Sequence, residues 1–247
     1  MNVSRTIASL VTMGLVLFVC PNVFGAESFN ISIGTDSKNE VGAALKIVGV
    51  MTALSLAPAV LLTTTSFVRV LVVLSLLRTA LGTQSSPPQM VLIGLSLFIT
   101  TAVMWPVGTQ LYEAGLEPYL DGKLEFNEAY SKGIAPVRDF MLRQTREEDL
   151  FLFYEISATP FPQTPGNVAM HLLVPSFVIS ELRTAFEMGF LLFIPFLMLD
   201  MIVAAITMSL GMVMLPPALI SMPIKLMLFV LVDGWNLITG SLVRSFA

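Results

Sequence analysis

The chain has 247 residues, of which 55% are hydrophobic and 12% charged, and its formal net charge at pH 7 is −4. Soluble domains carry roughly 25% charged residues, so this composition indicates a polytopic membrane protein, and the negative balance excludes a nucleic-acid-binding surface. With one cysteine and one histidine, an intrachain disulfide is excluded, and a histidine-based metal site or nucleophile pair within one subunit is disfavoured.

The first 25 residues are predicted to be a secretory signal peptide. Arg5 supplies a positive charge ahead of the apolar residues 7–19, and this run is shorter than the ~20 residues that a membrane span needs. Small residues after it predict cleavage between Gly25 and Ala26, and the alternative is an uncleaved first helix. The polar stretch that follows predicts a flexible mature N-terminus over residues 26–45.

Residues 46–112 are predicted to form a first hairpin of two long apolar helices. Residues 47–68 contain no charged side chain and are long enough to span a bilayer, with a kink expected at Pro58. Because the apolar pattern continues, this helix is expected to run on without a break to a stop at Gly82. A second span is expected over residues 90–112.

Two arginines predict the orientation of this hairpin. Arg69 and Arg78 lie near its connection, and no acidic residue occurs between Lys46 and Glu113. The positive-inside rule therefore places the connection in the cytoplasm. The mature N-terminus then lies outside the cytoplasm, which agrees with a cleaved signal.

Residues 113–171 form a polar insert with ten acidic and five basic residues. We expect the insert to be helical and extracytoplasmic. Pro136 is expected to begin one of its helices. The segment from Thr145 to Glu148 has the spacing of a capping box before an apolar run, which predicts the start of another helix.

Residues 172–247 are predicted to form a second hairpin. Its first segment is apolar but is interrupted by Glu181, Arg183 and Glu187, and the spacing of the last two favours a helical ion pair. Two helices joined by a loop are expected over residues 190–235, followed by a short tail. The whole pattern predicts an all-α membrane protein with about four long hydrophobic helices in two hairpins and a helical insert.

Asp200, Lys225 and Asp233 interrupt the apolar sequence of the second hairpin. A charge at bilayer depth costs at least ~2.5–3.5 kcal/mol on insertion scales, so it usually faces a partner or a water-filled path. We expect these charges to pair with each other, with Arg183 or with a neighbouring subunit. The alternative is that the two aspartates form a proton relay or a catalytic carboxylate pair, although no HExxH, GxSxG or P-loop motif accompanies them.

A methionine cluster precedes the loop of the second hairpin. Met208, Met212 and Met214 lie just before Pro216 and Pro217, where core packing is less expected. Methionine side chains are unbranched and repack readily. They could fill a core, or they could seal a pore that still yields to a passing polypeptide.

Four distinctive strings occur along the mature chain, and charges interrupt the apolar residues in the last three: MTALSLAP from Met51, LRTALG from Leu77, FMLRQTR from Phe140 and KLMLFVLVDGW from Lys225. In composition and in order these strings resemble the FliP family of flagellar type III export-gate proteins. The resemblance covers most of the mature chain.

The resemblance implies a pentameric channel subunit that is neither an enzyme nor a cofactor-binding protein. The implied partners are FliQ-type and FliR-type gate proteins, other export-gate components, membrane lipid and the unfolded flagellar proteins that are exported. The implied location is the inner membrane at the flagellar basal body. The family's gasket falls on Met212, Val213 and Met214, with valine in place of the more usual central methionine. A small ion- or solute-coupled transporter is the alternative function.

Overall fold

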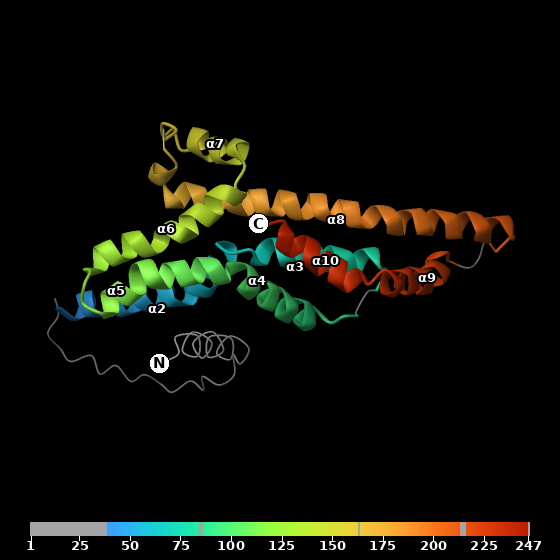
Figure 1. Ribbon diagram of the computed structural model, residues 1–247, viewed down its shortest axis with the longest axis horizontal. Helices are drawn as coiled ribbons and strands as arrows, with labels where there is room; N and C mark the ends of the chain where they lie inside the picture. Colours follow the sequence, from blue (N-terminus) through green and yellow to red (C-terminus); the bar gives the residue numbers. More distant parts are fainter. Residues whose placement is uncertain (1–38, 84–85, 163, 213–215, 247) are drawn as a thin grey trace. The chain divides into compact units, whose positions relative to one another are not determined.

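A computed structural model describes residues 39–83, 86–162, 164–212 and 216–246 of the chain. These residues form helices joined by turns, with no strand among them (Figure 1), so the predicted all-α fold is confirmed. The chain divides into two units after Ala53, inside helix α2 (Asn39–Thr63). The predicted signal peptide, its cleavage site at Gly25 and Ala26, and most of the predicted flexible N-terminus lie outside the described residues.

The first apolar stretch forms two helices instead of one. α2 ends at Thr63, and α3 (Phe67–Ala80) begins after a break at which the chain bends by 64°. The hydroxyls of Thr63 and Thr64 both donate to the carbonyl of Val60, at 3.1 and 2.9 Å. The same carbonyl also accepts the N–H of Thr64 at 3.0 Å, so the hydroxyls add to the last helical hydrogen bond, and such bonds can bend a helix. The predicted unbroken helix is therefore wrong, whereas the predicted stop at Gly82, with φ of +75°, is confirmed.

The second span is confirmed and is longer than predicted. Its helix, α4 (Gln89–Leu111), continues through a π-helical turn, η1 (Tyr112–Leu116), into α5 (Glu117–Leu120). Within this continuous segment of 32 residues, a window of 18 residues is apolar enough to cross a membrane. At 1.5 Å per residue the whole segment is roughly 48 Å long, which exceeds the ~30 Å hydrocarbon core of a bilayer.

The end of this long helix packs closely against α6 (Phe126–Gln144). A Cβ atom added at Gly115 would lie 2.7 Å from both the carbonyl oxygen of Ala129 and the Cα atom of Gly133. Both obstacles are backbone atoms, which cannot turn aside as a flexible side chain can. Glycine at position 115 is therefore required for this approach.

One helix of the insert does not begin where the sequence predicts, and the start of another lacks the predicted cap. α6 contains Pro136 in its interior, so this proline does not start it. α7 (Glu147–Ile156) has no side-chain cap, because the hydroxyl of Thr145 donates to the carbonyl of Met141 in the preceding turn. The predicted capping box is therefore wrong. The insert is helical, and its position outside the cytoplasm stays a prediction.

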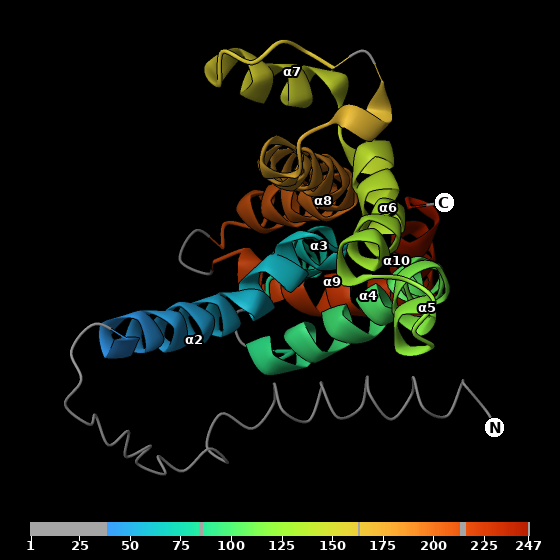
Figure 2. The ribbon, with the colours of Figure 1, turned by 90° about the vertical axis from the view of Figure 1, so that its left-hand side faces the viewer.

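The second hairpin is built on α8 (Met170–Ser209), a single helix of 40 residues. α9 (Ala218–Leu231) follows the loop, and the chain then bends by 66° into α10 (Gly234–Arg244). α8 packs against α3, α6, α7 and α9 (Figures 1 and 2). The predicted pair of helices joined by a loop is confirmed, whereas the predicted short tail is in fact helical.

Two apolar clusters form the core of residues 54–247. The first includes Leu74 of α3 and Leu242 of α10, both fully buried. The second includes Phe140 of α6 and Phe177 of α8. Phe246 packs against both clusters, and its ring stacks on that of Phe140 with the centroids 6.3 Å apart. The residues that follow α10 thus connect the two halves of the core.

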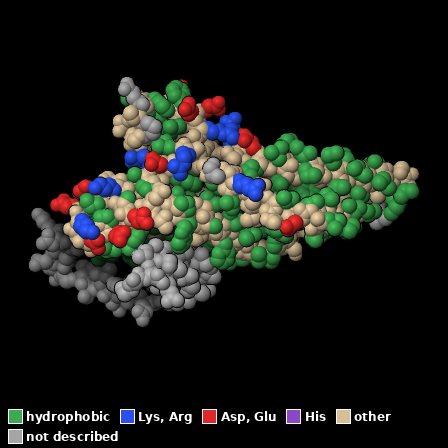
Figure 3. All heavy atoms as spheres, viewed as in Figure 1, with side chains coloured by type: hydrophobic (Ala, Val, Ile, Leu, Met, Phe, Trp, Pro, Cys, Tyr) green, Lys and Arg blue, Asp and Glu red, His purple; other side chains and the backbone are tan. Residues whose placement is uncertain are grey.

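Apolar side chains also cover much of the surface of residues 54–247. Hydrophobic atoms dominate the end that α8 and α9 form, whereas most of the visible charges lie over α5, α6 and α7 (Figure 3). Two helices are long and apolar enough to cross a membrane, or up to four if each bent pair is one span. The predicted class of membrane protein is therefore confirmed.

Candidate functional site

An ion pair joins the two arms of the second hairpin. Nζ of Lys225 on α9 lies 2.6 Å from Oδ2 of Asp200 on α8, and it also donates to the carbonyl of Ala80 at 3.2 Å. The Lys225 side chain is 7% exposed and that of Asp200 is 39% exposed. Ala80 is the last residue of α3, where carbonyls lack helical donors and carry the negative end of the helix dipole. Lys225 therefore ties α9 to both α8 and α3.

Asp233 takes no part in this ion pair. It lies between α9 and α10 with φ of +52°, and its Oδ2 accepts a hydrogen bond from Nδ2 of Asn236 at 3.1 Å. Within the described ranges, no ion pair joins it to Lys225 or Arg183. Aspartate tolerates left-handed backbone because its short side chain can bond locally. The structure thus places Asp233 in a turn between two helices.

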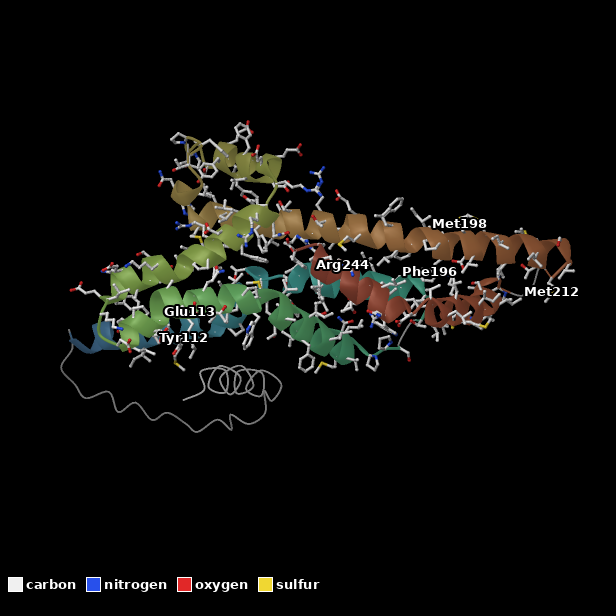
Figure 4. The ribbon with its side chains drawn as sticks, viewed as in Figure 1. Tyr112, Glu113, Phe196, Met198, Met212 and Arg244 are labelled. Atoms are coloured by element: carbon white, nitrogen blue, oxygen red, sulfur yellow. The ribbon has the colours of Figure 1, made fainter. Side chains whose placement is uncertain are left out.

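The hairpin tip is the place where α8 ends. Gly211 has φ of +75°, and the N–H of Met212 donates to the carbonyl of Thr207 at 3.1 Å. This is how a left-handed glycine closes a helix. Met212 lies at the tip of the hairpin (Figure 4) with 37% of its surface exposed. Val213 and Met214 lie outside the described residues, so only Met212 of the predicted gasket is placed.

The most buried ion pair joins Arg69 on α3 to Glu181 on α8. Nε of Arg69 donates to Oε2 of Glu181 at 2.9 Å, and Nη2 donates to Oε1. The two side chains are 2% and 0% exposed. The sequence interpretation put these residues in separate groups, with Arg69 as a basic residue of the cytoplasmic connection. A signal for the pair was present, because a carboxylate inside an apolar helix requires a partner.

Arg69 has further partners that the sequence did not reveal. Its Nη2 donates to Oε1 of Gln144 at 2.9 Å, and its Nη1 donates to the carbonyl and the hydroxyl of Ser245, both at 3.1 Å. Its guanidinium carbon lies 4.0 Å from the centre of the Phe246 ring. One buried arginine thus connects α3, α6, α8 and the residues after α10. No spacing or composition signal marks these partners.

The second orienting arginine, Arg78, remains beside the connection. It is half-buried, and its Nη1 lies 3.4 Å from the carbonyl of Pro87, between α3 and α4. Because Arg69 is buried against Glu181, Arg78 is the better of the two as an indicator of orientation. The cytoplasmic position of the connection stays a prediction.

Arg183 lies in an exposed charge cluster between α7 and α8. Its Nε is 3.6 Å from Oε1 of Glu187, as the spacing predicts, and its Nη1 is 3.4 Å from Oε2 of Glu148. Nη2 of Arg146 lies 2.7 Å from Oε2 of Glu187, and this hydrogen bond raises the pKa of the Arg146 guanidinium above its usual value. Because these side chains are solvated, the cluster contributes little to stability.

In the described part of the chain, the charged side chains mainly make contacts between helices. Within it, no cluster of three or more His, Cys, Asp or Glu side chains could hold a metal ion. His171 is exposed near the start of α8. What the geometry does provide is two ion pairs that fix long helices against each other and a methionine at the hairpin tip.

Comparison with known proteins gives one consistent result. The model of the FliP family matches residues 50–242 of this chain. The flagellar biosynthetic protein FliP of Caulobacter vibrioides is 52% identical over 220 residues, which cover 89% of this chain and 82% of that protein. The protein of the same name from Bacillus subtilis is 46% identical over 220 residues, which cover 89% of this chain and 99% of that protein.

Proposed function

Because the chain belongs to the FliP family, we propose that it is a channel-forming subunit of the flagellar type III protein export gate. The channel would let unfolded axial proteins of the flagellum leave the cytoplasm. The observation that carries this proposal is the family match over residues 50–242. The long apolar helices agree with such a role, since a membrane channel needs segments of that length.

In this proposal the subunit works as a homo-oligomer, a pentamer, together with FliQ-type and FliR-type proteins and other gate components. The assembly lies in the inner membrane at the flagellar basal body. Support comes from the exposed apolar side chains of α8 and α9, such as Phe190 at 66% and Val230 at 73%. Apolar surface on this scale is unstable in water, so lipid or neighbouring subunits would cover it.

Met212, Val213 and Met214 would line the constriction of the channel. Methionine is unbranched and repacks readily, so a ring of such side chains could exclude ions and still yield to a polypeptide. The exposed Met212 at the hairpin tip supports this assignment. The charges would serve assembly: Asp200 and Lys225, with Arg69 and Glu181, would hold the helices that carry the tip.

The experiment replaces the gasket residues in a strain that lacks the native protein. We expect the triple variant Met212→Gly, Val213→Gly, Met214→Gly to raise membrane conductance to small ions while flagellar subunits still reach the medium. Phe161→Gly is the matched control, because it also removes an exposed apolar side chain from a loop. Unchanged conductance in an assembled triple variant would rule out the gasket assignment.

A second variant tests assembly. Lys225→Ala removes the cation that ties α9 to α8 and α3, so we expect the pentamer to be lost from native gels. Lys132→Ala is the control, because that lysine is exposed and pairs only with Glu128 on its own helix. Recovery of an intact pentamer from the Lys225→Ala strain would contradict the assigned role.

A further inference from the structure

Helix α9 is attached to the rest of the protein along one narrow stripe. Its buried residues are Ser221, Lys225 and Phe229, which follow one another at intervals of four and therefore share one face of the helix. The other faces expose apolar side chains, such as those of Val230 and Leu231. Two of the three residues that hold α9 are thus polar, although the helix is otherwise apolar.

The polar part of this stripe centres on the ion pair of Lys225 with Asp200. Nζ of Lys225 donates to Oδ2 of Asp200 at 2.6 Å and to the carbonyl of Ala80 at 3.2 Å. The hydroxyl of Ser221 also interacts with the Asp200 carboxylate. The hydrogen bonds that join α9 to its neighbours therefore depend on one ammonium group and one carboxylate.

The two ion pairs that join long helices differ in how firmly they are held. Both Arg69 and Glu181 are buried, and the planar guanidinium meets the carboxylate through two nitrogens and has further partners on other segments. Lys225 is instead a compact charge on a flexible stem, and its partner Asp200 is 39% exposed. A pair with one partner already near solvent can separate when water reaches the other. The attachment of α8 to α3 is therefore permanent, whereas that of α9 to α8 is releasable.

The bend between α9 and α10 has the features of a hinge. The chain turns by 66° there, and Asp233 has left-handed φ of +52°. Gly234 follows, and a Cβ atom added to it would lie 2.2 Å from the ring of Phe229, so this ring packs directly on the glycine. Hinges are short segments at the ends of elements that absorb changes in backbone angle. The contact of Phe229 with Gly234 thus sets the position of α9 at its hinge end.

We propose that α9 is a movable arm, that Asp200 and Lys225 form a latch that holds the arm against α8, and that the arm turns at Asp233 and Gly234 when an exported polypeptide passes. α8 stays in place, because a buried ion pair fixes it to α3. Separating the two charges of the latch is unfavourable in apolar surroundings and becomes favourable once water enters. The latch therefore couples release of the arm to hydration of the path. This proposal rests on the export function proposed above and concerns how the hairpin opens.

Two buried serines provide a matched test of this movement. Ser221 on α9 is 1% exposed and Ser176 on α8 is 0% exposed, and each hydroxyl donates to a carbonyl of its own helix. Each serine is replaced by cysteine in a Cys20→Ser background, since Cys20 is the only cysteine of the chain. The host strain lacks the native protein and keeps the other gate components.

The probe is a small charged methanethiosulfonate reagent, which reacts with thiols that water reaches. It is applied from each side of the membrane, with and without an exported protein that is stalled in the gate by a fused domain that stays folded. The stalled polypeptide should raise the labelling rate of Ser221→Cys by about tenfold or more, because local opening controls the reaction of a buried group. Ser176→Cys should stay protected in both states.

Weakening the latch should have the same effect without a polypeptide. Asp200→Asn keeps the size of the side chain and removes its charge, so we expect Ser221→Cys to become reactive at rest and the membrane to conduct small ions. Asp121→Asn is the control, because its ion pair with Lys123 is exposed and lies within one turn. Native gels confirm that each variant assembles.

Two glycines of α10 test the hinge end of the arm. Gly234→Ala places a Cβ atom against the ring of Phe229, so it should displace the arm and expose Ser221→Cys at rest. Gly240→Ala is the matched control, since nothing lies within 4 Å of a Cβ atom added there. It should leave Ser221→Cys protected.

Several results would overturn the proposal. Ser221→Cys that reacts equally with and without a stalled polypeptide would show that the arm does not move during export. Labelling of Ser176→Cys together with Ser221→Cys would show that the whole fold loosens. Continued protection in an assembled Asp200→Asn variant would show that the ion pair is no latch.

Failure of the latch and failure of the proposed function give different results. If this chain is no export channel, export of flagellar proteins will not depend on it in the same strains. If only the latch is wrong, export will depend on the chain while Ser221→Cys stays protected. The comparison of the stalled and the empty gate leaves Asp200 and Lys225 unchanged, so it decides the proposal even where Asp200→Asn prevents assembly.

Discussion

Arg69 and Glu181, 112 residues apart in the chain, form an ion pair in the interior of the helical core. Two nitrogens of the guanidinium face the two oxygens of the carboxylate, which is the geometry that arginine offers and lysine does not. Burying two charges is costly unless the remaining hydrogen-bonding groups are satisfied. Gln144 and Ser245 accept from the other N–H groups, so the pair meets that condition.

Removing one partner of this pair should destabilise the protein far more than removing both partners. Glu181→Ala leaves a buried guanidinium without a carboxylate, and we expect the free energy of unfolding to fall by about 3–5 kcal/mol. The double variant Arg69→Met, Glu181→Leu removes both charges and should recover most of that loss. Unfolding of the purified protein in detergent, followed by circular dichroism, measures both.

A solvated pair on one helix is the control for that comparison. Glu128 and Lys132 lie four residues apart on α6, with side chains 54% and 52% exposed, so Glu128→Ala should change stability by no more than about 0.5 kcal/mol. A Glu181→Ala loss of similar size would mean that the buried pair does not hold α3 to α8.

Removing Asp200 should destabilise the protein more than removing Lys225. Asp200→Ala leaves Lys225, which is 7% exposed, as a desolvated charge, and we expect a loss of about 2–3 kcal/mol. Lys225→Met leaves Asp200, which is 39% exposed, in contact with solvent, so its loss should stay below about 1.5 kcal/mol. Unfolding of the two variants in the same detergent tests the order, and the reverse order would contradict this account.

The positions of the helices could be predicted from the sequence better than the contacts between their side chains. Apolar length alone indicates α4 and the second part of α8, because a bilayer sets how long such runs must be. The break after Thr63 was missed, since hydroxyl side chains are compatible both with a helix and with its end. Likewise, Asp200 and Lys225 could be recognised as charges that need partners, but the contact of Arg69 with Ser245 depends on packing that no local pattern encodes.

Two glycines that face each other should respond differently to the same substitution. Gly115→Ala places a Cβ atom 2.7 Å from backbone atoms of α6, whereas the nearest atom to a Cβ at Gly133 is 3.5 Å away. We expect Gly115→Ala to destabilise the protein by about 1–3 kcal/mol through forced backbone shifts. Gly133→Ala should be neutral, or stabilising by up to about 1 kcal/mol, since alanine favours helix. Thermal unfolding of both variants measures these changes in stability. Equal losses of stability would show that the two sites are not packed differently.

Two substitutions of Asp233 distinguish a structural role of this residue from a role in proton transfer. The substitution Asp233→Asn keeps the side-chain shape and the tolerance of left-handed backbone that the observed φ of +52° demands, but an amide cannot carry a titratable proton. We therefore expect motility and flagellar protein export in this variant to stay within about twofold of the parent strain. Loss of an essential carboxylate would instead lower export by about tenfold or more, which corresponds to about 1.4 kcal/mol. Asp233→Val should lower the amount of folded protein, because a branched side chain in this region costs about 1–2 kcal/mol.

The opposite result would favour the transporter alternative. If Asp233→Asn abolished function while the protein remained at its normal level in the membrane, the carboxylate itself would be required. A relay of that kind also predicts proton-coupled flux from the purified chain alone in liposomes. The observed contacts argue against it: Oδ2 of Asp200 is held by Lys225 at 2.6 Å and Oδ2 of Asp233 by Asn236 at 3.1 Å. Each aspartate is thus engaged locally, with neither paired to the other.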